Sequence, residues 1–303
     1  MSRKLLLGLI VVLVVTNLFT LLLLDKEPEV IHVQTNGDNG KQVGKTEQVA
    51  KVGDTEISYE DWIDSLTRKY GERHLKDMID RELVSQLAKE RGIEINEKLI
   101  DRDVAYLATM QGVMTKSERE KEENRWREEI LFRYQLEELL LSDVHIPEDE
   151  IQRHYQTYKN QYDFSESLQF SHIIVEDLTQ ANKVIEELNA GASFQLLARE
   201  YSLDDETKSR GGYLGFFTKV SQFVPQKYFE VAADMNDDSY SEPFQTDQGF
   251  VILYLHQHLP SITFTYEEIR DHVRNELAKN EIDYPITASI LWDEYDIEWI
   301  YGQ

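Results

Sequence analysis

The chain has 303 residues, of which 57 are acidic and 32 are basic, so its formal net charge is -25. This charge argues against a nucleic-acid partner, because phosphate contacts require clustered lysine and arginine. No cysteine occurs, which excludes disulfides, thiolate metal sites and a lipid-modified N-terminal cysteine. The length allows two modest cores, and the hydrophobic content of 41% is ordinary for a globular protein with one membrane segment.

The N-terminal segment 1–25 predicts a transmembrane signal anchor. Residues 5–24 carry no charge, and twenty helical residues span about 30 Å, the thickness of a bilayer core. Two basic residues precede the span and Asp25 follows it, which places the N-terminus in the cytoplasm and the remainder outside. A cleaved signal peptide is the alternative, but residues 21–26 lack the small residues of a cleavage site. We therefore expect a single-pass cell-membrane protein that contacts the lipid bilayer through residues 5–24.

The next segment, 26–47, is polar and contains proline and several glycines, so it is predicted to be a flexible linker. From Val49 the pattern changes to a short strand with a tight turn at Gly53, followed by helices. Ser58 is expected to cap the helix that starts near Tyr59, because a serine hydroxyl accepts from the free amides of the first turn.

The remaining sequence outside residues 166–259 predicts mainly helices. Apolar residues recur at helical spacing up to Gly92, and further helices are expected at 97–111, 117–142, 148–160 and 266–280. Residues 296–301 alternate like a strand and are expected to pair with the strand at Val49, because an exposed terminal strand would be a liability.

That pairing predicts the domain organisation. Residues 48–147 and 260–303 would form one discontinuous, mainly helical domain, with residues 148–165 as a connecting helix. Residues 166–259 would be inserted into it as a second unit. We expect a strand at 168–175, a helix at 179–189, a second helix capped by Ser193, a glycine-rich loop and a last strand at 250–255. The fold class is therefore α+β, with helices on a mixed sheet.

Residues 166–258 also carry spaced motifs that resemble a parvulin-type peptidyl-prolyl cis-trans isomerase domain. The motifs are Ser171-His172-Ile173, the loop Arg210-Gly211-Gly212-Tyr213-Leu214-Gly215, and Ser241-Glu242-Pro243 before Thr246. The flanking helices resemble those of the PrsA and SurA foldases. The resemblance implies rotation about the peptide bond that precedes proline, without cofactor or metal. It also implies that the partners are unfolded or partly folded exported polypeptides that contain X-Pro bonds.

Site residues follow from the resemblance position by position. It implies a polar catalytic floor and a pocket for the proline ring. The catalytic residues would be His172, Asp204 and Thr246, and the substrate-binding residues would be Leu214, Phe217, Phe223, Tyr228 and Gln248. The loop 219–229 is longer than usual, so Phe229 competes for the place given to Tyr228.

One departure from the family pattern bears on activity. Val251 stands where relatives carry a second histidine, and a valine neither donates nor accepts a hydrogen bond. We expect His172 to bond instead to Thr246, water or the backbone, with activity reduced or lost. The alternative function is therefore a non-catalytic holding chaperone or scaffold with a degenerate parvulin domain.

Overall fold

The computed structural model describes residues 30–33, 41–44 and 47–302. The predicted membrane span at residues 5–24 lies outside these ranges. Within the part of the chain that is described, no helix is both long enough and apolar enough to cross a membrane. The chain divides into two compact units: one runs to Asp80 and takes in the C-terminal segment from Ile297, and the other is Arg81–Asp296.

The first unit is built from two hairpins and the start of a long helix. Its elements are β1 (Val30–Val33), β2 (Lys41–Gly44), β3 (Gln48–Val52), β4 (Thr55–Ser58), α2 (Tyr59–Leu66), a π-helical turn at Thr67–Gly71, and α3 (Glu72–Glu90), which continues into the second unit. The hairpin β1-β2 falls within the segment predicted to be a linker. Ser58 caps α2 as expected, since its Oγ accepts from the Asp61 backbone N–H at 3.1 Å.

The predicted C-terminal strand is wrong. Residues 296–301 form no strand in the structure, and the partner of β3 is β4, the next strand along the chain. Gly302 N–H donates to the Trp299 carbonyl at 3.1 Å, which closes a turn, and the Trp299 ring packs edge-on against Tyr301. The alternating residues therefore form a short turn with packed aromatic rings. The strand predicted to pair with them, β3, pairs instead with β4.

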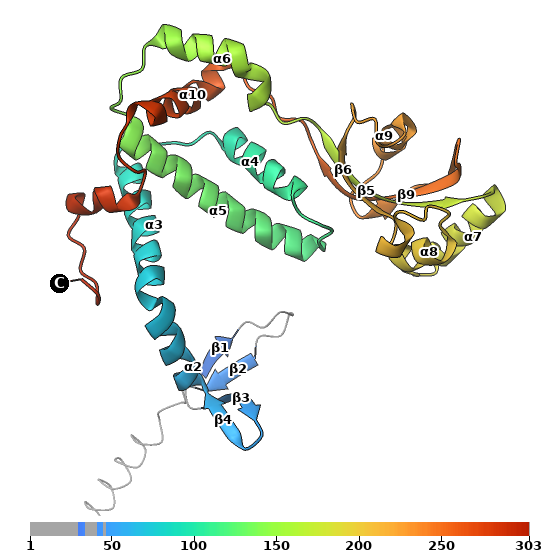
Figure 1. The fold of residues 1–303 in the computed structure, drawn as a ribbon, viewed down its shortest axis with the longest axis horizontal. Helices are drawn as coiled ribbons and strands as arrows, with labels where there is room; N and C mark the ends of the chain where they lie inside the picture. The colour runs from blue at the N-terminus through green and yellow to red at the C-terminus, as the bar shows by residue number, and fades with distance from the viewer. Residues whose placement is uncertain (1–29, 34–40, 45–46, 303) are drawn as a thin grey trace, which may run out of the picture. The chain divides into compact units, whose positions relative to one another are not determined.

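The helical part of the second unit joins segments from before and after the sheet. Its helices are α4 (Glu97–Thr109), α5 (Lys116–Leu141), α6 (Glu148–Tyr162) and α10 (Tyr266–Glu281), followed by a 3-10 turn at Ala288–Glu294. One apolar core contains Trp126 of α5, Tyr155 of α6 and Val273 of α10. In Figure 1, α10 lies beside α6, and α4 lies along α5. The helix predicted only as a connector is thus part of the helical core.

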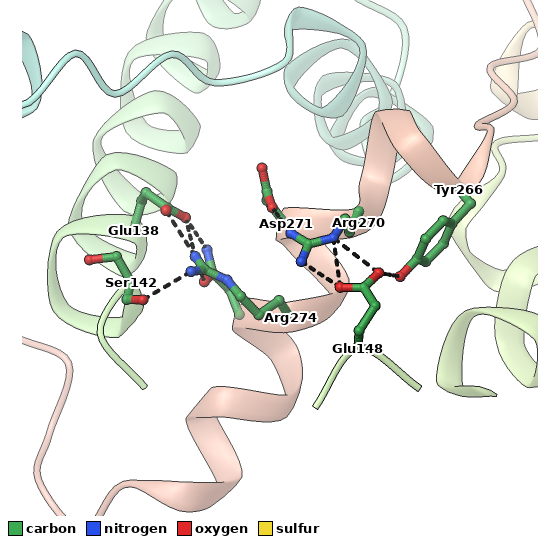
Figure 2. A network of polar contacts seen from close by, with 8 residues as sticks. Glu138, Ser142, Glu148, Tyr266, Arg270, Asp271 and Arg274 are labelled. Carbon is green, nitrogen blue, oxygen red and sulfur yellow. Dashed lines mark hydrogen bonds and ion pairs between the residues drawn. The ribbon is translucent and has the colours of Figure 1, made fainter. Parts of the chain in front are cut away.

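A polar network fixes α10 to the two helices that precede the sheet (Figure 2). Arg274 donates to both carboxylate oxygens of Glu138 at 2.8 Å and to the Ser142 carbonyl at 3.1 Å. One turn earlier, Arg270 pairs with Glu148 at the start of α6. The sheet is therefore an insertion whose two ends return to the same helical core.

The inserted part is a five-stranded antiparallel sheet covered on both faces. Its elements are β5 (Ser167–Val175), α7 (Leu178–Asn189), α8 (Phe194–Tyr201), a 3-10 turn at Lys208–Arg210, β6 (Tyr213–Thr218), α9 (Gln226–Ala232), β7 (Ser239–Tyr240), β8 (Phe244–Thr246) and β9 (Gly249–Leu259). The strand order is β6-β5-β9-β7, with β8 paired to β9. All pairings are antiparallel, so the expectation of a mixed sheet is wrong. Ser193 stands at the N-cap position of α8 as predicted, but its side chain makes no capping hydrogen bond.

Alternation along the central strand β5 assigns its side chains to the two faces of the sheet. Phe170 and Ile174 pack with α9, whereas Ile173 and Val175 pack with α7 and α8. Figure 1 shows α9 on the opposite side of the sheet from α7 and α8. His172 has the same parity as Phe170 and Ile174, so it faces α9.

Candidate active site

A pocket of about 590 Å³ opens on the α9 face of the sheet. It lies where β5, the loop after α8 and the segment before α9 meet. Its lining residues are His172, Ile174, Leu203, Asp204, Glu206, Thr207, Leu214, Phe223, Val224, Pro225, Tyr228 and Gln248. The pocket thus combines a polar side, formed by the residues around His172, with an apolar side formed by leucine, valine and aromatic side chains.

His172 is buried, with 6% of its surface exposed, and both ring nitrogens have partners. Nε2 lies 2.7 Å from Asp204 Oδ2 and 3.1 Å from Thr207 Oγ1. Nδ1 lies 2.9 Å from the hydroxyl of Tyr228. The expectation that His172 would bond to Thr246, water or the backbone is therefore wrong for its side chain, because Tyr228 and the Asp204 loop reach it first.

The loop after α8 holds Asp204 through local hydrogen bonds. Ser202 Oγ accepts from the Asp204 backbone N–H at 3.3 Å, and Asp204 Oδ1 accepts from the Glu206 backbone N–H at 3.1 Å. The Thr207 hydroxyl donates to Asp204 Oδ2. Because Thr207 also contacts His172 Nε2, the three side chains form one cluster at the floor of the pocket.

Ionisation of this cluster follows from its burial and contacts. Burial lowers the pKa of His172 and outweighs the opposing effect of Asp204, so the imidazole is neutral near pH 7. Desolvation alone would raise the pKa of Asp204, but hydrogen bonds from Thr207 and His172 lower it below its ordinary value. The site therefore combines a neutral imidazole with an ionised carboxylate.

The predicted binding residues divide into two groups. Leu214, Tyr228 and Gln248 line the pocket, and Phe223 lies at its rim with 91% of its surface exposed. Phe217 does not line it; its ring stacks on Phe170 at 6.5 Å between centroids. The register of β6 shifts at Leu214, so Leu214 and Phe217 both pack against the apolar cluster under α9, and Phe217 lies opposite Leu168, farther along the strand from the pocket.

The structure places Tyr228 and Phe229 in different surroundings. Tyr228 lines the pocket, whereas Phe229 is buried against Phe170 in the apolar cluster under α9. Of these two neighbours on α9, Tyr228 is therefore the one that lines the pocket.

Thr246 lies away from the imidazole. Its hydroxyl donates to the Gly249 carbonyl at 3.1 Å and accepts from the Gln248 backbone N–H at 3.2 Å. These bonds close the β8-β9 turn, and Thr246 is not among the pocket residues. The contact with His172 that was expected of Thr246 is made in this structure by Thr207. The sequence signal for Thr207 is its position three residues after Asp204, where a hydroxyl reaches back to a preceding carboxylate.

No part of the described chain offers a metal site. Among residues 47–302, no group of three or more histidine, aspartate or glutamate side chains is arranged to hold a metal ion. The pocket around His172 can bind an apolar ring against its apolar side chains and place a carboxylate and an imidazole beside a neighbouring polar group.

Comparisons with known proteins indicate the family to which the chain belongs. The family model described as "Rotamase: PPIC-type PPIASE domain" matches residues 175–257. YacD of Bacillus subtilis (strain 168), which carries the name of a peptidyl-prolyl cis-trans isomerase, is 33% identical over 258 residues, covering 85% of this chain and 86% of YacD. The foldase protein PrsA of Halalkalibacterium halodurans is 31% identical, covering 81% of this chain and 75% of that protein. The crystal structure of PrsA from Bacillus subtilis covers 85% of this chain and 96% of its own, with 19% identity and a TM-score of 0.33.

These relatives define the class of protein as a peptidyl-prolyl cis-trans isomerase with the organisation of a foldase. The chain belongs to the family of PPIC-type peptidyl-prolyl isomerases that includes YacD and the PrsA foldases.

Proposed function

We propose that this isomerase acts at the pocket of His172 and Asp204, on X-Pro bonds in unfolded polypeptides outside the cytoplasmic membrane. The observation that carries the proposal is the composition of that pocket. One pocket of about 590 Å³ is lined by apolar side chains such as Leu214, by a buried imidazole and by an ionised carboxylate. A proline ring and the carbonyl that precedes it need this combination of surfaces.

The reaction requires no covalent step. Rotation about a peptide bond has a barrier of about 18–20 kcal/mol because resonance gives the C–N bond double-bond character. That resonance form puts negative charge on the carbonyl oxygen. A carboxylate that faces this oxygen, and an apolar wall that removes water from it, both destabilise the planar amide relative to the twisted one. Each reduction of about 1.36 kcal/mol in the barrier raises the rate tenfold.

The role of Asp204 is tested by Asp204→Ala in the full chain, with cis-trans exchange of an Ala-Pro peptide measured by NMR. We expect kcat/KM to fall at least about tenfold, because the carboxylate that faces the carbonyl is lost. Asp205→Ala is the matched control, since Asp205 is the neighbouring acid, its side chain is 84% exposed and it pairs with Lys208. Equal rates for the two variants would remove Asp204 from the mechanism.

The structure removes the argument for the alternative function of a non-catalytic holding chaperone. It rested on a His172 left without a partner by Val251, and His172 instead has three side-chain partners. Catalysis equal to the uncatalysed peptide in the full chain, together with protection of an unfolded client from aggregation, would restore the holding function.

Anchoring by residues 5–24 completes the proposal. The uncharged span, the preceding basic residues and Asp25 support a single crossing with the isomerase unit outside. Clients would then be exported polypeptides that emerge unfolded beside the membrane, where slow proline steps of tens to hundreds of seconds delay folding.

A further inference from the structure

We propose that Tyr228 is a positioning residue of the isomerase site: its hydroxyl donates to Nδ1 of His172 and holds the imidazole as the Nε2–H tautomer that faces Asp204. The inference rests on the proposed function, because it concerns the same pocket. It gives Tyr228 a role beyond that of an apolar wall, and it explains how a chain without the second family histidine keeps an ordered His172.

The position of the imidazole proton follows from the chemistry of its neighbours. An ionised carboxylate only accepts hydrogen bonds, so the nitrogen 2.7 Å from Asp204 Oδ2 must carry a proton. That nitrogen is Nε2. In a neutral imidazole the other nitrogen, Nδ1, is then an acceptor. The Tyr228 hydroxyl, 2.9 Å from Nδ1, therefore donates to it.

Burial of the three groups supports these protonation states. Burial lowers the pKa of His172 and so favours the neutral ring. Hydrogen bonds from Thr207 and His172 keep the pKa of Asp204 below its ordinary value, despite its desolvation. Burial and the charge of Asp204 raise the pKa of Tyr228, so its hydroxyl keeps its proton.

The tyrosine ring is fixed by packing, which fixes the hydroxyl. Tyr228 is 1% exposed, and its ring lies edge-on to Phe170 and to Phe244, at 6.3 and 5.8 Å between centroids. Pro225 lines the same pocket just before α9 begins at Gln226. A buried tyrosine hydroxyl needs a partner, and the partner that the structure gives it is His172.

Val251 shows why the donor comes from α9. It lies on β9 opposite Ile174, is fully buried, and packs in the apolar cluster under α9. The polar contact that a histidine at this position would supply is absent from β9. Tyr228 at Nδ1, with Asp204 and Thr207 at Nε2, satisfies both nitrogens of His172 from other elements.

The experiment compares Tyr228→Phe with the full unmodified chain. Phenylalanine keeps the ring but removes the hydroxyl, so the pocket wall and KM are expected to stay unchanged. We expect kcat on an Ala-Pro peptide to fall about tenfold, the loss of one hydrogen bond of ordinary strength. Tyr240→Phe is the matched control. Tyr240 lies on β7 of the same sheet, and its hydroxyl bonds to Asn189 of α7 and not to His172.

A second readout follows the imidazole directly. The ring ¹⁵N resonances of His172, assigned by their loss in His172→Gln, should show a protonated Nε2 and an acceptor Nδ1 in the unmodified chain. In Tyr228→Phe the Nδ1 resonance should move toward that of an acceptor without a donor, and in Tyr240→Phe it should stay in place.

Two results would overturn the inference. One is a proton on Nδ1 in the unmodified chain, a measurement that does not depend on the folding of any variant. The other is an unchanged kcat and Nδ1 resonance in Tyr228→Phe. Failure of the proposed function is distinguishable, since it appears as an unmodified chain that does not speed the exchange, whatever the state of the imidazole.

Discussion

At the scale of single residues, the sheet contains two buried histidines on opposite faces. His172 faces α9 and belongs to the pocket, whereas His256, 5% exposed, contacts Ser171 Oγ at 2.8 Å through Nε2. Burial lowers the pKa of His256 to about 4. Because neither ring lies free in solvent, both are neutral in the folded chain near pH 7, but only His172 has a carboxylate partner.

Stability below neutral pH should depend on His256. In the unfolded chain its pKa is about 6.5, so between pH 6.5 and 4 the unfolded chain binds a proton that the folded chain does not. The free energy of unfolding is therefore unaffected by His256 above pH 6.5. It decreases as the pH falls below 6.5, by about 3 kcal/mol at pH 4. Urea unfolding of His256→Gln against pH should show a smaller slope in this window. His258→Gln, at a half-buried histidine paired with Glu166, is the control.

Gly212 is a second residue-scale constraint on the site. Its φ is +76°, and an added Cβ would lie 2.1 Å from the carbonyl oxygen of His172. This carbonyl belongs to the residue whose backbone N–H donates to the Gly212 carbonyl at 2.9 Å. A side chain here would therefore push β5 and the glycine loop apart.

We expect Gly212→Ala to lower the free energy of unfolding by more than about 2 kcal/mol and to reduce isomerase activity. Gly191→Ala provides the comparison, because Gly191 also has a positive φ, +93°, but nothing lies within 4 Å of its added Cβ. Thermal midpoints that fall equally for both variants would show that backbone conformation alone, and not the clash with His172, sets the cost.

At the scale of elements, α10 is the segment that returns the chain to the helical core after the sheet. A capping box begins it, in which Thr265 and Glu268 bond to each other's backbone N–H groups. Two arginines on α10 then pair with α5 and α6, and their surroundings differ. The Arg274 and Glu138 side chains are 15% and 22% exposed, whereas those of Arg270 and Glu148 are 40% and 55% exposed.

The two ion pairs should therefore contribute unequally. Arg274→Ala removes the charged partner of the largely buried Glu138 and leaves it the hydrogen bond from the Asn275 amide, and we expect a loss of about 2 kcal/mol in unfolding free energy. Arg270→Ala breaks an exposed pair and should cost about 0.5 kcal/mol. Urea midpoints of the two variants measure the difference. A larger loss in Arg270→Ala would contradict the ranking by burial.

At the scale of the whole molecule, the proposed anchor determines where the isomerase works. The full chain is expected to stay with membranes after an alkaline wash. Replacing Val14 and Val15 with arginine, near the middle of the span, should release it, because each central arginine costs about 2.5–3.5 kcal/mol on insertion. Val43→Arg, outside the span, should change nothing. A mature chain that lacks the N-terminal span and is released from membranes by the wash would favour the cleaved signal peptide.

Periodicity and turn chemistry in the sequence determined most of the local structure. Helical spacing and capping residues placed α4, α5, α6 and α10 within a few residues of their observed bounds, because these signals act within one or two turns of chain. The isomerase unit was identified differently, through the resemblance of the motifs around His172 to those of a known family. The strand expected at 296–301 failed because alternation does not say whether a partner strand is available.

Only the tertiary structure decided which side chains meet around His172. Thr246 is near the site in sequence pattern but bonds within its own turn, while Thr207 and Tyr228 reach the imidazole from separate elements. Such contacts depend on how α9 and the loop after α8 pack on β5, which involves residues 32 and 56 positions from His172. The sequence alone determined which chemistry is present, and the packing determined which groups carry it.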